Sequence, residues 1–172
     1  ALANGDMVSI NTNGTVSKAN VVISSSTTIG TSAEFEPAGA HEISCAYDST
    51  NNRVVVTYMD QGDNYYGKAC VGTVSGTTIS WGTPVTFDSN QYIYYTNITF
   101  DSNAGKMVLV WRRASGSTGI YSAVGTVSGT SISFGSTEQI SSDGATLSSE
   151  SLTFDSNLNK AVVVMKKSNG DG

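Results

Sequence analysis

The sequence is poor in charge, in proline and in the residues that catalysis and metal binding usually need. Only 13% of its 172 residues are charged, against about 25% in an average soluble domain, and it has 2 prolines, 2 cysteines and 1 histidine. Its 9 Lys and Arg residues form no basic stripe and are outnumbered by 14 acidic residues. Because nucleic-acid binding needs clustered cations that displace counterions, we exclude nucleic acid as a partner.

Long apolar runs are missing as well. The sequence has no run of about 18 apolar residues, so we expect no membrane insertion. No basic segment precedes an apolar stretch, so no signal peptide is visible. Ala and Leu are scarce, whereas Gly, Ser, Thr and Asn are abundant, which favours strands and tight turns over helices. The hydrophobic share of 38% is enough for a folded core.

Two sequence signatures repeat with one period. The segment that begins Val71-Gly-Thr-Val-Ser-Gly returns, nearly unchanged, at Val124, 53 residues later. An aromatic residue followed by Asp-Ser, a turn, a basic residue and an apolar run occurs at Tyr47, Phe100 and Phe154, with spacings of 53 and 54 residues. Since two independent markers share the period, the chain is internally repetitive.

Each period divides into four strand-like pieces separated by turns rich in Gly, Asn, Asp and Ser. In the first complete unit these pieces are residues 42–48, 53–60, 65–75 and 78–87. Ile43, Cys45 and Tyr47 alternate along the first piece and are expected to face inward, and the Val54–Val56 run predicts a strand buried on both faces. We therefore predict an all-β fold of ~53-residue, four-stranded antiparallel repeats that resemble β-propeller blades. The alternative is a duplicated β-sandwich or prism.

The repeat also predicts the organisation of the chain. We expect an N-terminal hairpin and half-repeat at 1–41, repeat 1 at 42–95, repeat 2 at 96–149 and a partial repeat 3 at 150–172. These make three blade equivalents, whereas propellers typically close with about four to eight. Either the chain is a piece of a longer repeat protein, which we favour, or two chains join complementary termini in a ring of six.

Few residues carry a chemical signature. His41 has no nucleophile motif near it and is expected to be an exposed loop residue, so we predict no enzymatic activity and no cofactor. Asp48, Asp101 and Asp155 recur with the repeat, and we interpret them as turn-forming residues in preference to calcium ligands. Cys45 and Cys70 have no zinc-like spacing, and we expect two buried thiols in preference to a disulfide.

The aromatic residues fall into two groups. Those that keep their place in the repeat are expected to be core, namely Tyr47, Phe100, Phe154, Trp81, Phe134 and Trp111. Tyr92, Tyr94 and Tyr95 align with a small, polar stretch of the next unit, so the repeat does not require them. We expect these three tyrosines either to pack between blades or to form a patch that stacks on sugar rings.

The two alternating signatures resemble the repeats of tail-fibre-like and other virion-associated proteins of marine phages, especially cyanophages. The resemblance covers residues 42–172 well and the first 41 residues loosely. It implies a structural role in a virus particle, with contact to a host surface, and it transfers no catalytic residue. The partners it implies are other copies of the chain, other virion proteins and surface glycans. The alternative is a lectin-like, glycan-binding propeller module that is secreted or on a cell surface, so the expected location is virion or extracellular.

Overall fold

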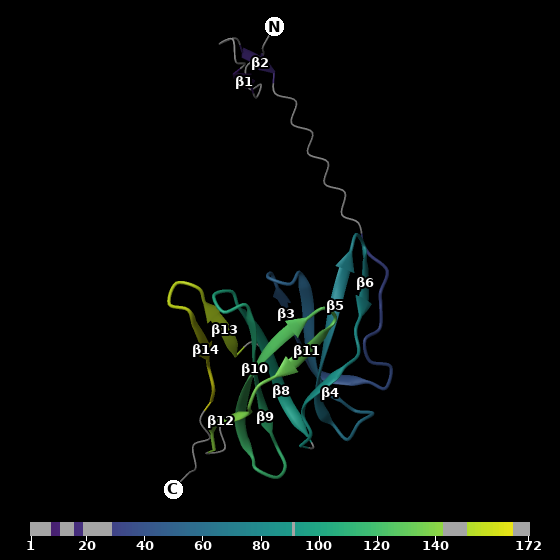
Figure 1. Ribbon diagram of the computed structural model, residues 1–172, viewed down its shortest axis with the longest axis vertical. Coiled ribbons are helices and arrows are strands. Elements are labelled where there is room, and N and C mark those ends of the chain that lie inside the picture. Colours follow the sequence, from purple (N-terminus) through teal and green to yellow (C-terminus); the bar gives the residue numbers. More distant parts are fainter. Residues whose placement is uncertain (1–7, 11–15, 19–28, 91, 143–150, 167–172) are drawn as a thin grey trace.

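The structure, a computed structural model, describes residues 8–10, 16–18, 29–90, 92–142 and 151–166 (Figure 1). Every regular element in these residues is a strand, and every strand pairing is antiparallel, so the predicted all-β class is confirmed. The N-terminal pair consists of β1 (Val8–Ile10) and β2 (Val16–Lys18). The turn of the predicted N-terminal hairpin lies outside the described residues, as do Gln91 and the stretch at 143–150.

Two five-stranded sheets have the same strand order. In the first sheet the order is β3-β4-β5-β6, and β7 pairs with the other half of β5. In the second sheet the order is β8-β9-β10-β11, and β12 pairs with the other half of β10. The first sheet contains β3 (Ala40–Asp48), β4 (Arg53–Asp60), β5 (Tyr66–Ser75), β6 (Thr78–Trp81) and β7 (Val85–Asp88). The second sheet contains β8 (Ile93–Asp101), β9 (Lys106–Arg113), β10 (Gly119–Ser128), β11 (Ser131–Phe134) and β12 (Glu138–Ser141).

A further strand pair, β13 (Leu152–Asp155) and β14 (Lys160–Val163), follows the second sheet. Figure 1 shows the second sheet between the first sheet and this pair. One face of the second sheet shares a hydrophobic cluster with the first sheet, and the other face packs Val110 and Ile120 against Leu152, Val163 and Met165. The second sheet is therefore covered on both sides.

The predicted fourth strand, 78–87, is wrong as a single element because it breaks into β6 and β7 between Gly82 and Pro84. Pro84 has no N–H to donate to a neighbouring strand. Gly82 lies so close to the second sheet that a Cβ atom there would stand 1.9 Å from the carbonyl oxygen of Thr130. The strand breaks where the next sheet approaches its backbone.

The break in the outer strand lets aromatic rings pack between the two sheets, in a contact that we call the aromatic joint. Phe87 of β7 packs edge-on against Trp111 of β9 and Phe134 of β11, with ring centroids 5.0 and 5.8 Å apart. Phe35, 52 residues earlier, packs in the same way against Tyr58 and Trp81 at 5.1 and 5.5 Å. The same three-ring contact therefore occurs at two successive places along the chain.

An acidic residue follows the aromatic one in each joint. Asp88 Oδ2 accepts hydrogen bonds from Trp111 Nε1 at 2.5 Å and from Arg113 Nε at 2.6 Å. Glu36 Oε2 accepts a hydrogen bond from the Tyr58 hydroxyl at 3.1 Å. These acceptors satisfy donors that packing would otherwise leave buried without partners.

The expectation that Ile43, Cys45 and Tyr47 face inward is wrong. Ile43 and Tyr47 are 56% and 54% exposed, and Cys45 is exposed as well. The face of β3 that meets the second sheet carries Ser44 and Ala46 instead, because the alternation has the opposite phase. Tyr47 is therefore not a core residue in the described structure, although its hydroxyl donates to Asn52 Oδ1 at 2.7 Å.

The prediction of two buried thiols holds for one cysteine only. Cys70 of β5 is fully buried, whereas Cys45 of β3 is exposed, and both are free. Burial raises the pKa of the Cys70 thiol. Cys70 is buried because it belongs to a hydrophobic cluster with Val56 and Tyr58, against which Phe35 and Trp81 pack, whereas no described residue covers the face of β3 that carries Cys45.

The doubly buried strand predicted at 53–60 is present as β4, in which Val55 and Val56 are buried on opposite faces. We expect Val55→Asp to prevent folding, because an unpaired carboxylate in this core costs about 4 kcal/mol or more. Circular dichroism and urea denaturation measure the loss. The matched control is Val162→Asp at the corresponding position of β14, which is exposed and should fold. Normal folding of Val55→Asp would contradict this account of the core.

Candidate functional site

The three tyrosines singled out by the sequence lie at the start of β8 and just before it. Tyr92 stacks on Tyr65, with ring centroids 5.0 Å apart and planes 17° apart, and Tyr94 lies against Tyr95 at 6.2 Å. Tyr92 and Tyr95 are 41% and 37% exposed, and Tyr94 is half-buried. The structure thus forms two pairs of tyrosine rings, and Tyr65 is a member that the repeat pattern does not single out.

The backbone at this cluster is unusual. Tyr65, Tyr92 and Tyr95 all have positive φ angles, of 60°, 60° and 53°. For a bulky side chain this left-handed conformation costs about 1–2 kcal/mol. Such strain is found most often at sites that bind ligands or undergo conformational change.

Tyr92 occupies a position where the preceding unit has glycine. Its carbonyl oxygen accepts a hydrogen bond from Ala114 N at 3.2 Å, and that of Gly39, 53 residues earlier, accepts one from Gln61 N at 3.1 Å. Gly39 also has a positive φ, of 101°, which glycine adopts without strain. The fold therefore needs the left-handed backbone here but does not need an aromatic side chain.

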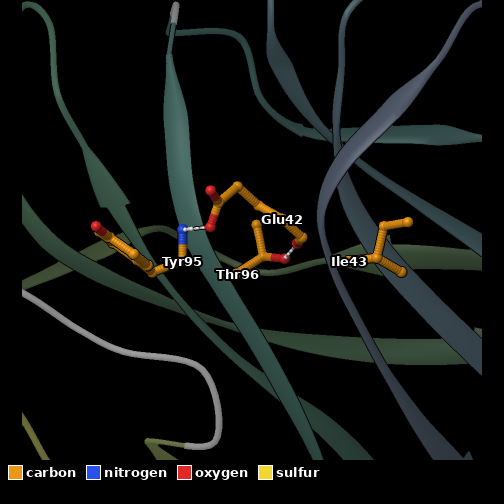
Figure 2. A pocket seen from close by; sticks show the side chains of 4 residues that line it. All are labelled: Glu42, Ile43, Tyr95 and Thr96. Atoms are coloured by element: carbon orange, nitrogen blue, oxygen red, sulfur yellow. Dashed lines mark hydrogen bonds between the residues drawn. The ribbon is translucent and has the colours of Figure 1, made fainter.

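A pocket of about 200 Å³ lies beside Tyr95, lined by Glu42, Ile43, Tyr95 and Thr96 (Figure 2). Glu42 Oε2 accepts a hydrogen bond from Tyr95 N at 2.8 Å, and the Thr96 hydroxyl donates to the Glu42 carbonyl oxygen. In Figure 2 Glu42 and Thr96 lie between the Tyr95 ring and the Ile43 side chain. A carboxylate and an aromatic ring thus line one opening between β3 and β8, and the buried hydroxyl of Thr96 is engaged by Glu42.

Two equivalent β-bulges form this pocket. The register of β3 on β4 shifts between His41 and Ser44, and that of β8 on β9 shifts between Tyr94 and Asn97. Glu42 and Tyr95, which are 53 residues apart, are the left-handed residues of these bulges. The bulges could not be predicted from the sequence, because neither residue is a glycine and their side chains have nothing in common.

The recurring aspartates are engaged in their own turns. Asp48 Oδ1 accepts from the backbone N–H groups of Thr50 and Asn51 at 2.9 and 3.0 Å. Asp101 and Asp155 make the same pair of bonds, at 2.8–2.9 Å and at 2.9–3.1 Å. This geometry matches the turn interpretation. Among the described residues no three His, Cys, Asp or Glu side chains gather as metal ligands.

The other polar groups form structural pairs. His41 is exposed but belongs to β3, not to a loop, and its Nε2 lies 3.1 Å from Gln61 Oε1. Lys68 Nζ lies 2.6 Å from Asp63 and 3.5 Å from Asp60. Burial lowers the pKa of Lys68, but its hydrogen bonds and attraction to Asp63 and Asp60 outweigh that effect, so the pKa is raised. The Arg113 guanidinium lies 3.9 Å from the centre of the Tyr121 ring.

Comparison of the chain with protein-family models, with curated proteins and with solved structures gives no match. In the part of the chain that the structure describes, no helix has the length and hydropathy needed to cross a membrane.

Titration of Tyr58 should be visible in the stability of the protein. Burial, followed by the hydrogen bond to Glu36 and its charge, holds the pKa of Tyr58 far above its ordinary value. A raised native pKa means that its contribution to stability is complete below about pH 10 and is lost as the pH rises towards the native pKa. We expect Tyr58→Phe to cost about 1 kcal/mol at neutral pH and to flatten the decline of stability above pH ~10.

Urea denaturation at several pH values between about 9 and 11.5 measures both effects. Tyr47→Phe, which removes an exposed hydroxyl, is the matched control. If the stability of Tyr58→Phe fell with rising pH at the same slope as that of the parent protein, the hydrogen bond between Tyr58 and Glu36 would not be an energetic part of the joint.

Proposed function

We propose that the chain is a non-enzymatic structural module of a virus particle, in which β-propeller-like repeats stack into a fibre-like component that contacts the host surface. The observation that carries the structural part is the aromatic joint, in which Phe35 and Phe87 play the same role at successive junctions. Because the joint repeats in this way, further units can be added through the same kind of contact. The assignment to a virus particle rests on the resemblance of the repeat to virion proteins.

The packing of the sheets supports propeller-like blades over a duplicated sandwich or prism. A sandwich buries one face of each sheet against a single partner. Here the second sheet has one face against the first sheet and the other against β13 and β14. The first strands of successive units, β3, β8 and β13, are also neighbours, as the inner strands of adjacent blades would be.

The proposal is tested on purified virus particles from the source of the sequence. An antibody against the chain should label the particles in electron microscopy, and mass spectrometry of dissociated particles should recover its peptides. The denatured mass of the labelled polypeptide then shows whether these residues are part of a longer repeat protein. A chain that is found only outside particles would contradict the proposal.

The second candidate function is glycan binding at the tyrosine cluster. The observation that favours it is the strained backbone at Tyr92, where the preceding unit uses Gly39 at the same position. Exposed aromatic faces stack on the apolar faces of sugars, and Glu42 could accept hydrogen bonds from sugar hydroxyls at the neighbouring pocket. On this alternative the chain would be a lectin-like module, secreted or on a cell surface.

We expect Tyr92→Gly to keep the stability of the protein within about 1 kcal/mol, because relief of backbone strain offsets the lost stacking on Tyr65. If the cluster binds glycans, the same substitution should abolish binding on a glycan array. Tyr47→Ala, which removes an exposed tyrosine elsewhere, is the matched control and should bind normally. Absence of binding by the parent protein on a broad array would reject this candidate.

A further inference from the structure

One face of β3 carries apolar side chains that nothing in the described structure covers. This face, which we call the β3 face, consists of Ile43, Cys45 and Tyr47, all of which are exposed. The corresponding residues of β8 in the second sheet are Thr96, Ile98 and Phe100, and they are buried or half-buried. The same position in the repeat is thus covered in one unit and open in the other.

The molecule itself shows what covers this position. In the second sheet, Ile98 and Phe100 pack in one cluster with Ala46 of β3 and Val55 of β4. The first two strands of the preceding unit are therefore the elements that close over the first strand of the next. By analogy, the elements that would cover the β3 face are the first two strands of another repeat.

Part of that cover is already present. Phe35 lies over Tyr58 and Trp81, where Phe87 lies over Trp111 and Phe134 in the next joint. Gly30 approaches the carbonyl oxygen of Thr77 as Gly82 approaches that of Thr130. Residues 30–35 thus supply the contacts of a fourth strand, and the uncovered part is the part that first and second strands would cover.

The other end of the described chain has those two strands with an open face. β13 and β14 are the first and second strands of their unit, and their inner face packs on the second sheet. On the outer face Val162 and Val164 are 43% and 68% exposed. Their counterparts in the first sheet, Val55 and Thr57, are fully buried.

We infer that β13 and β14 of one copy dock on the β3 face of a second copy, so that the chain associates with itself head to tail. This inference deepens the proposed scaffold function and rests on it. The two faces differ, so the contact is heterologous and produces either a closed ring or an open fibre. The other possible occupants, a further repeat or a different protein, would leave the purified chain monomeric.

The equivalence predicts a specific contact. Across the joint of the first and second sheets, Thr57 Oγ1 and Thr96 Oγ1 lie 3.4 Å apart in a buried position. Their counterparts across the proposed contact are Val164 of one copy and Ile43 of the other. Both are exposed apolar side chains here, and their contact would replace a hydroxyl pair with an apolar pair.

Disulfide trapping tests this contact. In a Cys45→Ser background, Ile43→Cys combined with Val164→Cys should form disulfide-linked dimers and larger species on a non-reducing gel. The matched control combines Ile43→Cys with Leu158→Cys, an equally exposed position in the β13–β14 turn. Because association raises the local concentration of the correct pair, its cross-linking should be at least about tenfold faster than that of the control. Equal rates, or a disulfide within one chain, would overturn the inference.

Sedimentation of the unmodified chain provides a second readout. As the protein concentration increases, the measured mass should rise above the mass of one chain. Val164→Asp should weaken this association by about tenfold or more and leave the circular dichroism spectrum unchanged. A folded chain that remains monomeric up to about 1 mM would overturn the inference. A monomeric chain that is nevertheless found in virus particles would leave the proposed function intact, whereas an associating chain that is absent from particles would reject only that function.

Discussion

This fold depends on the aromatic joint, in which a phenylalanine of one sheet packs against two aromatic rings of the next sheet. Phe87 meets Trp111 and Phe134, and Asp88 beside it satisfies the indole N–H and the Arg113 guanidinium. A sheet of this kind carries apolar side chains on both faces, so it cannot be stable alone. With so little charge in the chain, ion pairs contribute little, and burial between sheets has to supply the stability.

The same constraint explains the irregularities of the backbone. For Phe87 to reach the next sheet, the outer strand must break, and it does so at Gly82, where the approach of Thr130 leaves no space for a Cβ atom. The first strands of neighbouring units must also pass close together, and a bulge in each brings Glu42 against the backbone of Tyr95. Bulges and broken strands here follow from stacking, and they recur because the stacking recurs.

The period and the strand pairing were predictable because they depend on local chemistry. Turn residues such as Asp48 bond to their own backbone, and the apolar run around Val55 is buried wherever the strand lies. Which face of β3 points to the next sheet was not predictable, because alternation gives two faces without saying which has a neighbour. Tyr47 was assigned to the core since it matches Phe100, and only the absence of a covering unit in the described residues distinguishes them. The pocket at Glu42 depends on β-bulges that no residue type in the sequence predicts.

In a repeat protein, the residues that define the repeat and the residues that define a function are separable. A side chain that recurs at successive junctions, like the aromatic rings of Phe35 and Phe87 in the joint, is explained by packing alone. A side chain that appears in one unit at a strained position, like Tyr92 where another unit has Gly39, is not required by the repeat. The tyrosine cluster is therefore a departure from the repeat, and the β3 face is a position of the repeat that no described residue covers, whereas its counterpart in the second sheet is covered. The first feature supports the proposed glycan site, and the second supports the proposed contact with a second copy.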